Sequence, residues 1–319
     1  MPCYNEQRTI RLLLDSIYHQ SYPRQNIEVI IADGLSTDQT RQEIQEFSLA
    51  NKDLVVRVID NQKRSIPSGL NQALDAARGI YFVRLDAHSV PSKDYVARSV
   101  AALADGLGDN VGGLWEIQPG SDTWQARSIA RAAAHPLGVG DARYRVGGRA
   151  QEVDTVPFGA FQRSLVERIG KFDETLLTNE DYEFNTRIRR AGGKIWFDPE
   201  IKSTYVARQN FRDLAHQYWR YGFWKVKMLR RFPESFRWRQ LAGLFVLSFP
   251  VLALLGIWFG WARWLLTIEI VVYLLALILA GLQQAIRYRD LTLFWGVPLA
   301  IATMHFSWGT AFIWSMISK

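Results

Sequence analysis

The sequence is poor in cysteine, and no secretory signal is visible in its first residues. Its 319 residues include one cysteine, Cys3, which excludes an intramolecular disulfide and is compatible with a reducing compartment. The amino-terminal residues lack the charged and apolar regions of a signal peptide. The sequence also has no internal repeat and no low-complexity linker, so neither a repeat architecture nor a disordered connection is predicted.

Charged residues become scarce after Gln240. Leu241–Gly260 has none, Trp264–Ala285 has only Glu269, and Leu291–Ile317 has no formal charge but contains His305. Each run is long enough to cross a hydrocarbon core of about 30 Å, so hydropathy predicts three transmembrane helices. We expect structural roles for Glu269 and His305, although charges inside a membrane are often functional.

Positive charge is concentrated just before the first of these runs. The formal net charge is +7, and much of the excess lies at Lys225, Lys227, Arg230, Arg231, Arg237 and Arg239. The positive-inside rule places this segment and the domain before it in the cytoplasm, and Arg287 and Arg289 return to the same side. Because these residues adjoin apolar runs and tryptophans, anionic lipid is a better partner for them than nucleic acid.

Strands and helices alternate in the first part of the chain. The hydrophobic pattern predicts strands at Ile27–Ala32, Leu54–Ile59 and Gly79–Leu85, and helices at Thr9–Gln20, Thr40–Leu49 and Ser68–Ala77. Ser36, Thr37 and Asp38 are expected to cap the second helix. Such alternation is typical of an α/β domain with a mainly parallel sheet covered by helices on both faces.

The alternation becomes less regular after Gly79–Leu85. Further strands are predicted at Val111–Ile117 and Asp154–Phe161, with helices at Gln162–Gly170 and Asp181–Ala191, and Lys194–Asp198 is expected to close the soluble part. Gly138–Gly148 is expected to be a mobile loop. Phe211–Phe232 has aromatic residues at helical spacing among lysines and arginines, which favours a helix lying in the membrane interface.

Two acidic clusters carry the chemistry. Asp86 follows the apolar strand Gly79–Leu85, at the edge where open α/β sheets bind ligands. Asp86 and His88 are two residues apart and together suit one divalent cation, which can neutralise a diphosphate. The second cluster, Glu180 and Asp181, offers a carboxylate that can take a proton. Together the clusters predict group transfer from a nucleotide-activated donor.

Five motifs in order resemble the family 2 inverting glycosyltransferases of the GT-A fold. They are Pro2–Glu6, Ala32–Thr40, Leu85–His88, Phe172–Glu174 and Asn179–Asp181. Three segments resemble the enzymes of the succinoglycan-type branch of exopolysaccharide biosynthesis. They are Arg84–His88, which extends one of the five motifs, Val153–Val156 and Gln217–Gly222. The resemblance covers about residues 2–230 and implies the GT-A nucleotide-diphospho-sugar transferase fold, followed by transmembrane helices.

The resemblance also implies roles for single residues. It places Tyr4, Glu6, Asp33, Arg64 and Asp86 at the nucleotide sugar. Asp33 would accept a hydrogen bond from the base, and Arg64 would lie near the diphosphate. Asp86 and His88 would hold the metal, with His88 where the family usually has a second aspartate. Asp181 matches the general base. Four residues match the acceptor or diphosphate side, and one of them is Glu180, the neighbour of the base. The others, Gln217, Arg220 and Tyr221, are similar to a Q-x-x-R-W motif with Tyr221 in place of its tryptophan.

The family has one core strand before the Pro2–Glu6 turn that this sequence does not show. We therefore expect either that the native start lies upstream of Met1 or that the chain is truncated. The expected domains are a cytoplasmic catalytic domain (1–208), a basic aromatic interfacial segment (209–240) and a membrane domain with three transmembrane helices (241–319).

The expected function is that of a membrane-anchored, metal-dependent inverting hexosyltransferase. With Mg²⁺ or Mn²⁺, it would move a sugar from a UDP-sugar to a polyprenyl-diphosphate-linked saccharide in exopolysaccharide biosynthesis. The resemblance implies a multi-pass protein of the bacterial inner membrane with its catalytic domain in the cytoplasm. Two alternatives stay open, a polyprenyl-phosphate glycosyltransferase and a catalytically silent subunit that binds nucleotide sugars.

Overall fold

The computed structural model describes residues 1–237, 240–241 and 245–318. The chain forms two compact units. The first unit comprises Met1–Glu116 and Gly147–Tyr205, and the second comprises Ile117–Val146 and Val206–Lys319. The division after Tyr205 lies three residues from the predicted boundary after residue 208, but the sequence pattern did not indicate that 117–146 joins the carboxy-terminal part.

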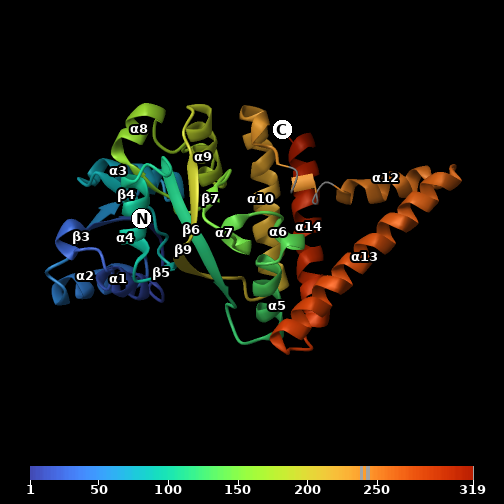
Figure 1. Ribbon diagram of the computed structural model, residues 1–319, viewed down its shortest axis with the longest axis horizontal. Coiled ribbons are helices and arrows are strands. Elements are labelled where there is room, and N and C mark those ends of the chain that lie inside the picture. Colours follow the sequence, from blue (N-terminus) through green and yellow to red (C-terminus); the bar gives the residue numbers. More distant parts are fainter. Residues whose placement is uncertain (238–239, 242–244, 319) are drawn as a thin grey trace. The chain divides into compact units, whose positions relative to one another are not determined.

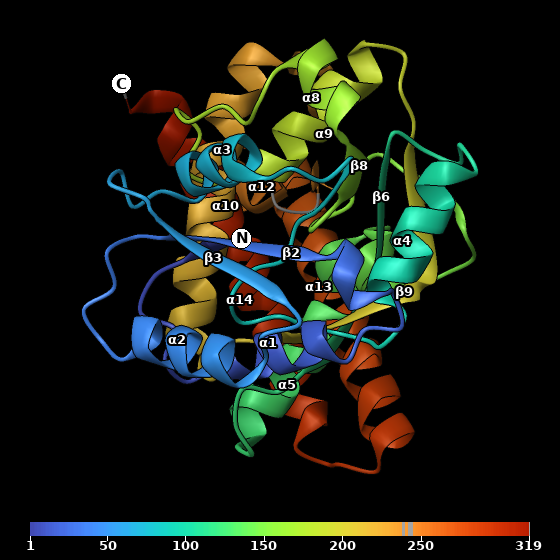
Figure 2. The same ribbon diagram turned by 90° about the vertical axis from the view of Figure 1, so that its left-hand side faces the viewer.

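The first unit begins with a three-stranded parallel sheet in the order β1-β2-β3. Its strands are β1 (Pro2–Cys3), β2 (Glu28–Asp33) and β3 (Val55–Asp60). Its helices are α1 (Ile10–Tyr18), the 3₁₀ turn η1 (Arg24–Asn26), α2 (Thr40–Ala50) and α3 (Ile66–Ala76). Figure 2 shows α1 and α2 on one side of β2 and β3, and α3 on the other. The predicted strands and helices of this region are confirmed.

Side-chain alternation along β2 explains this layering. Val29 and Ile31 are buried in the cluster that contains α1 and α2, whereas Ile30 and Ala32 are buried against Ala73 of α3. Successive side chains of a strand point to opposite faces, so an apolar run without a polar face requires cover on both sides. That cover holds the carboxyl ends of β1, β2 and β3 in a fixed position.

The rest of the first unit is built on a second, six-stranded sheet in the order β4-β8-β6-β9-β5, with β7 beside β9. Its strands are β4 (Tyr81–Val83), β5 (Val90–Pro91), β6 (Asn110–Gln118), β7 (Gln151–Glu152), β8 (Ala160–Gln162) and β9 (Ile195–Val206). Its helices are α4 (Tyr95–Ala104), α8 (Arg163–Ile169) and α9 (Glu180–Arg190). Figure 1 shows β6 and β9 side by side.

The expectation of a mainly parallel sheet is wrong for this second sheet. β8 runs antiparallel to β4 and β6, and β9 runs antiparallel to β5 and β7. A parallel pair needs a helical crossover between its strands. Here neighbouring strands come from distant parts of the chain, so the regular strand–helix pattern before Gly79 does not extend to them. The fold is therefore an α/β fold with a mixed arrangement of strands.

Several element boundaries also differ from the prediction. The strands expected at Gly79–Leu85 and Asp154–Phe161 shorten to β4 and β8. The segment Lys194–Asp198 lies at the start of strand β9, which continues to Val206. The expected loop Gly138–Gly148 overlaps two short helices, α6 (Pro136–Val139) and α7 (Arg143–Val146). The His135 ring accepts the Leu137 N–H and so caps α6.

An apolar cavity of about 340 Å³ lies in the first unit. It is lined by residues of β2, β4, α3 and α4, with Met1 at its wall. Along β2, only Ala32 and Asp33 pair with β1, and the Met1 ammonium donates to the Ile30 carbonyl at 2.6 Å. Within the described residues, the Glu28–Ile30 stretch of β2 therefore has a strand partner only in β3.

The second unit is helical. Its remaining elements are α5 (Trp124–Ala133), α10 (Phe211–Arg231), η2 (Pro233–Ser235), η4 (Phe245–Leu247), α12 (Ser248–Leu255), α13 (Gly260–Tyr288) and α14 (Leu293–Ile317). α10 lies along α14 (Figure 1), and a Cβ at Gly222 would overlap the Trp308 carbonyl oxygen. A Cβ at Gly296 of α14 would likewise overlap Ser128 of α5. These glycines allow close helix packing.

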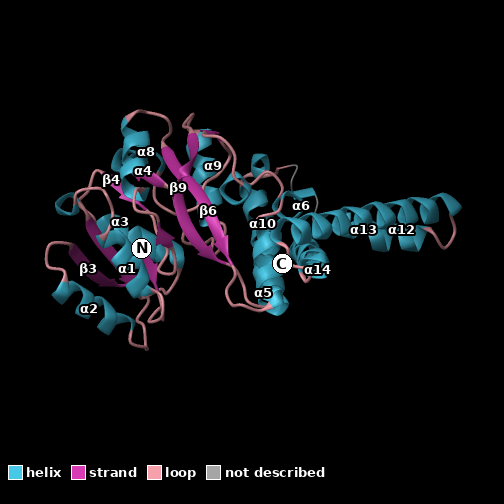
Figure 3. Ribbon diagram, turned by 60° about the horizontal axis from the view of Figure 1, so that its bottom comes forward, coloured by secondary structure: helices cyan, strands magenta, loops and turns pink. Residues whose placement is uncertain are grey.

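Three transmembrane helices are not what the described residues show. Within the part of the chain that the structure describes, α13 is the one helix long and apolar enough to cross a membrane. α12 has 8 residues and a length of about 12 Å, while residues 242–244 of the first predicted span lie outside the described part. α12 lies against the beginning of α13 (Figure 3).

α14 has 25 residues, but it packs on α5 and α10 as a core helix of the second unit. Although α14 is long enough to span a membrane, its most apolar stretch falls below the mean hydropathy expected of a span, unlike that of α13. Glu269 and His305, for which structural roles were expected, each have a hydrogen-bond partner. Ser248 donates to Glu269, and His305 Nε2 lies 2.9 Å from the Leu137 carbonyl oxygen.

Candidate active site

One buried guanidinium joins the two acidic clusters predicted from the sequence. Arg84 directly follows β4 and is 5% exposed. It donates to Glu180 Oε1 at 2.9 Å and to Asp86 Oδ1 at 3.3 Å, and it forms a short ion pair with Asp181 Oδ1. The tertiary structure thus brings together Asp86, from the end of a strand, and Glu180 and Asp181, from the start of α9.

Local conformation explains how α9 presents its first residues. Asn179 precedes the helix with φ 68°, a left-handed conformation that asparagine tolerates better than most residues. Glu180, Asp181 and Glu183 lie in the first turn, where the helix dipole favours negative charge. Glu183 pairs with Arg187 within the helix, so it belongs to the scaffold.

The charges of this cluster do not balance. Arg84 supplies one positive charge against the three carboxylates of Asp86, Glu180 and Asp181. Burial raises the pKa of Asp181 to about 7, while Arg84 opposes the rise and the two other carboxylates add to it. The Asp181 side chain is 23% exposed. It is therefore accessible to a small molecule and able to take a proton near neutral pH.

Asp86 and His88 fit a cation only when a ligand completes the coordination. His88 Nδ1 lies 3.1 Å from Glu6 Oε1, and Asp86 faces Arg84. Among the described residues, no three His, Cys, Asp or Glu side chains form a ready metal site. A divalent cation bound through one or two carboxylates plus phosphate oxygens is usual for Mg²⁺, so this donor set fits a cation that binds with a diphosphate.

Glu6 lies beside His88 and not in a separate pocket. Burial opposes ionisation of Glu6, but hydrogen bonds from His88 and Thr9 outweigh it and lower the pKa of this carboxylate. Glu6 is thus an anionic group near the position where the family usually has a second aspartate. The family resemblance predicted Glu6 at the nucleotide sugar but did not predict its contact with His88.

Tyr4 and Arg64, both predicted at the nucleotide, lie next to each other. The Arg64 guanidinium carbon is 5.6 Å from the centre of the Tyr4 ring, and 46% of Tyr4 is exposed. Three residues of these turns have a positive φ, which is 51° at Arg64, 54° at Asn5 and 61° at Leu35. Non-glycine residues with positive φ cluster at functional sites, which supports a binding role for these turns.

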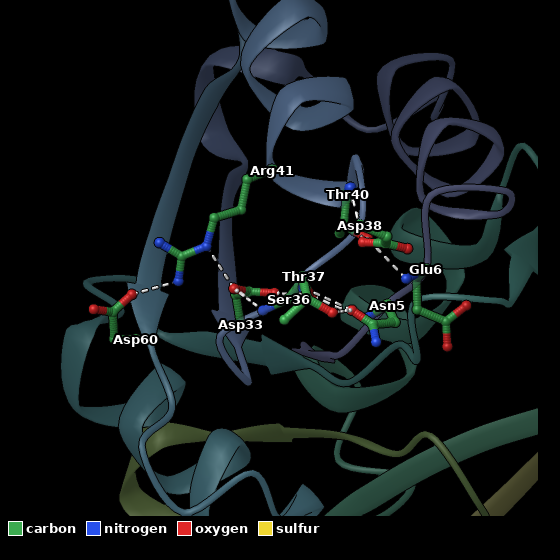
Figure 4. A network of polar contacts seen from close by, with 9 residues as sticks. All are labelled: Asn5, Glu6, Asp33, Ser36, Thr37, Asp38, Thr40, Arg41 and Asp60. Carbon is green, nitrogen blue, oxygen red and sulfur yellow. Dashed lines mark hydrogen bonds and ion pairs between the residues drawn. The ribbon is translucent and has the colours of Figure 1, made fainter.

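Asp33, predicted to contact the base, is fully buried and already bonded within the chain (Figure 4). It accepts from the Ser36 hydroxyl at 2.5 Å and from Arg41 Nε at 2.6 Å, and Arg41 also donates to Asp60 at 2.5 Å. Asp33 and Asp60 are paired positions at the ends of neighbouring parallel strands, so their carboxylates need a cation between them. Sequence reasoning missed Arg41 and Asp60, although both strand ends were predicted.

The N-cap residue of α2 is Gln39, which makes no side-chain cap hydrogen bond. The expected cap is therefore wrong for Ser36 and Thr37, and Asp38 contributes only from the position before the N-cap. Asp38 accepts the Thr40 N–H at 3.0 Å, which satisfies one of the free amides at the start of α2. Ser36 instead bonds Asp33 and accepts the Asn5 N–H at 2.9 Å, while Thr37 donates its N–H to the Asn5 side chain (Figure 4). These two residues hold the turns after β1 and β2 together.

The predicted acceptor residues on α10 belong to the second unit. Gln217 donates to the Tyr221 hydroxyl at 3.0 Å, and Arg220 is exposed on the same helix. The motif spacing of four residues therefore produces a contact within α10. Their role toward an acceptor stays a prediction.

Comparison with known proteins identifies the family. The family model described as "Glycosyl transferase family 2" matches residues 1–170. The chain belongs to glycosyl transferase family 2. It is 30% identical over 317 residues to the "Succinoglycan biosynthesis protein ExoA" of Rhizobium meliloti, covering 98% of this chain and 92% of that protein. The expected family resemblance is confirmed, and the chain is a glycosyltransferase.

Further relatives of this glycosyltransferase extend the comparison. A dolichyl N-acetyl-alpha-D-glucosaminyl phosphate glucuronosyltransferase of Methanococcus voltae is 25% identical over 311 residues, covering 96% of this chain and 92% of that protein. The mannosyltransferase PcManGT of Pyrobaculum calidifontis, solved with GDP-Man and Mn²⁺, aligns with a TM-score of 0.60 at 22% identity over 95% of this chain and 85% of that chain. The S. aureus TarS 1-349 complex with UDP-GlcNAc has a TM-score of 0.53 at 17% identity, over 95% and 88%. The solved structures establish the fold as GT-A.

Proposed function

We propose that this glycosyltransferase moves a sugar from a nucleotide sugar, a UDP-sugar, to a polyprenyl-diphosphate-linked saccharide and inverts the anomeric centre. The observation that carries the proposal is the cluster of Asp86, Glu180 and Asp181 on Arg84. It combines a carboxylate suited to a metal–diphosphate with a carboxylate suited to proton transfer, in one site of a family 2 chain.

Asp181 acts as the general base. Its carboxylate takes the proton of the acceptor hydroxyl while that oxygen forms a bond to the anomeric carbon. The bond from this carbon to the diphosphate breaks, and its electron pair leaves with the nucleoside diphosphate. A raised pKa near 7 makes Asp181 a stronger base than an ordinary carboxylate at the pH where it is still largely ionised.

The donor binds at the ends of β1 to β4. Tyr4 and Arg64 receive the base and the diphosphate, and Asp33 and Glu6 hold the turns around them. Asp86 and His88 would hold Mg²⁺ or Mn²⁺, and such an ion stabilises the negative charge of the leaving diphosphate. The Mn²⁺ in the mannosyltransferase complex supports this assignment.

The acceptor is proposed to be lipid-linked and to approach from a membrane. α13 supplies one helix of membrane length, with Trp261 and Trp264 exposed at one end and Arg287 near the other. Tryptophan and arginine are enriched at such positions of a span. The catalytic unit would face the cytoplasm at the bacterial inner membrane, and the name of the succinoglycan relative supports exopolysaccharide biosynthesis.

A second candidate acceptor is polyprenyl phosphate itself. The relative from Methanococcus voltae is named for a dolichyl phosphate that already carries a sugar, so its name supports a lipid-linked acceptor and does not distinguish the two candidates. The remaining alternative is a catalytically silent subunit that binds nucleotide sugars. An intact Asp86 and Asp181 in one cluster argue against a silent subunit.

The test offers a panel of nucleotide sugars to purified membranes with Mn²⁺ and measures release of nucleoside diphosphate. Lipid products are then identified by mass spectrometry and their anomeric configuration by NMR. We expect release of UDP and a lipid-linked product of inverted configuration. Absence of any release would support the silent subunit, and a retained configuration would refute Asp181 as base for a single displacement.

A further inference from the structure

Arg84 contacts carboxylates that belong to both halves of the proposed reaction, yet no role has been assigned to it. Asp86 lies on the donor side, and Glu180 and Asp181 lie on the acceptor side. We propose that Arg84 is a positioning residue that fixes Asp181 for proton transfer while competing with the divalent cation at Asp86. This inference rests on the proposed function.

The contacts of Arg84 are unequal, and this inequality indicates which partner it keeps. Its bonds to Asp181 and to Glu180 are short, the latter 2.9 Å, whereas those to Asp86 are 3.3 and 3.4 Å. Long contacts of this kind are weak hydrogen bonds. Arg84 is thus held chiefly by the first turn of α9, and Asp86 can turn toward a cation without breaking that hold.

The surroundings restrict where the guanidinium can go. Its carbon lies 5.7 Å from the centre of the Phe158 ring and 6.0 Å from that of Phe172, within the range of cation–π attraction. The backbone N–H of Arg84 donates to the Gly159 carbonyl at 3.1 Å, which anchors its Cα. A fixed positive charge beside Asp86 repels a second cation there and at the same time holds Asp181 in place.

The two effects have opposite signs in a variant that lacks the charge. Arg84→Met removes the repulsion at Asp86, so Mn²⁺ should bind at least about threefold more tightly, since like charges this close interact strongly. The same change frees Asp181, and misplacing a reacting group by about 1 Å can lower the rate by about 100-fold. We expect kcat to fall at least about tenfold, with the donor KM unchanged or lower.

The experiment measures two quantities on the full-length protein. Mn²⁺ affinity is determined by electron paramagnetic resonance of the unbound ion, with and without the nucleoside diphosphate that the donor panel identifies. Turnover is measured per folded molecule. A purely structural Arg84 predicts weaker Mn²⁺ binding and lower turnover together, whereas a residue without a role predicts no change in either. Either of these two results would overturn the proposal.

Arg187→Met is the matched control. Arg187 is also an arginine bonded to α9, through Glu183 at 2.5 Å and the Ile169 carbonyl at 2.6 Å. Its loss should lower the melting temperature and leave both Mn²⁺ affinity and turnover per folded molecule near the wild-type values.

If Arg84→Met does not fold, Arg84→Lys replaces it. Lysine keeps the charge but cannot bond both α9 carboxylates with a planar fork. We expect wild-type Mn²⁺ affinity with a lower kcat, and full turnover would refute the proposal. Asp181→Asn separates this outcome from failure of the proposed function. If Asp181→Asn is active, Asp181 is not the general base and the proposed function fails in this respect. If Asp181→Asn is inactive while an Arg84 variant is fully active, only the positioning role of Arg84 is refuted.

Discussion

Asp181→Asn should make the protein more stable and almost inactive at the same pH. The folded protein raises the pKa of Asp181 from 3.8 to about 7, chiefly because the carboxylate is buried. Between these two values the folded state binds a proton that the unfolded state has released. Raising the pH through this window therefore lowers the free energy of unfolding. Above pH 7 the loss is complete.

The size of the effect follows from the shift. About three pKa units correspond to about 4 kcal/mol at pH 8, and somewhat less than half of this loss is already present at pH 5. Asparagine has no such penalty, although it gives up a charge-assisted bond from Arg84, which reduces the gain by about 1–2 kcal/mol. We expect Asp181→Asn to reduce the pH dependence of stability between pH 5 and pH 8 by about 2 kcal/mol, or roughly 3 °C in Tm.

The assay combines melts with turnover. Thermal melts of the wild type and the variant are recorded at pH 5 and pH 8 without metal or donor, and transfer is measured with both present. Transfer should fall about 10²- to 10⁴-fold, the usual size of base catalysis, with donor affinity nearly intact. Asp75→Asn, in an exposed pair with Lys171, is the control and should change neither. More than a tenth of wild-type turnover, or a variant less stable at pH 8, would refute the reasoning.

Three further predictions concern other parts of the molecule. Asp86→Ala should weaken both donor affinity and Mn²⁺ or Mg²⁺ dependence. His88→Ala should do so less or change the preferred metal, because imidazole is a softer ligand than carboxylate. Full activity in excess EDTA would show that the mechanism needs no metal. An amino-terminal extension of about six apolar β-branched residues should raise Tm, because it can pair with the Glu28–Ile30 edge of β2 and fill the adjoining cavity. A glycine–serine extension of equal length is the control, and equal melting temperatures would contradict the idea. Arg220→Lys should sharply reduce transfer to the lipid acceptor with little change in Tm, because lysine cannot hold a phosphate through two parallel bonds. Arg212→Lys on the same helix should have no such effect, and a destabilised Arg220→Lys protein would favour a structural ion pair.

The local pattern of the sequence was sufficient for the first sheet and for the position of the chemistry. The apolar run of β2, the helical spacing in α1 and the acidic residues after β4 and in the first turn of α9 depend only on neighbours in the chain. Such signals are preserved in any fold that buries the same faces, so they can be interpreted without coordinates. The motifs that carry the family resemblance are of the same local kind.

Only the tertiary structure decided which of these features meet. Arg84 was quoted within a motif, but nothing in its neighbours indicates that it bonds Asp86, Glu180 and Asp181, because the last two lie almost a hundred positions away. Arg41 between Asp33 and Asp60, and the antiparallel partners of β8, depend likewise on long-range packing. Hydropathy measures how apolar a segment is and not what covers it. Of α13 and α14, only α13 meets the length and hydropathy expected of a membrane span, and the packing of α14 on α5 and α10 was visible only in the tertiary structure.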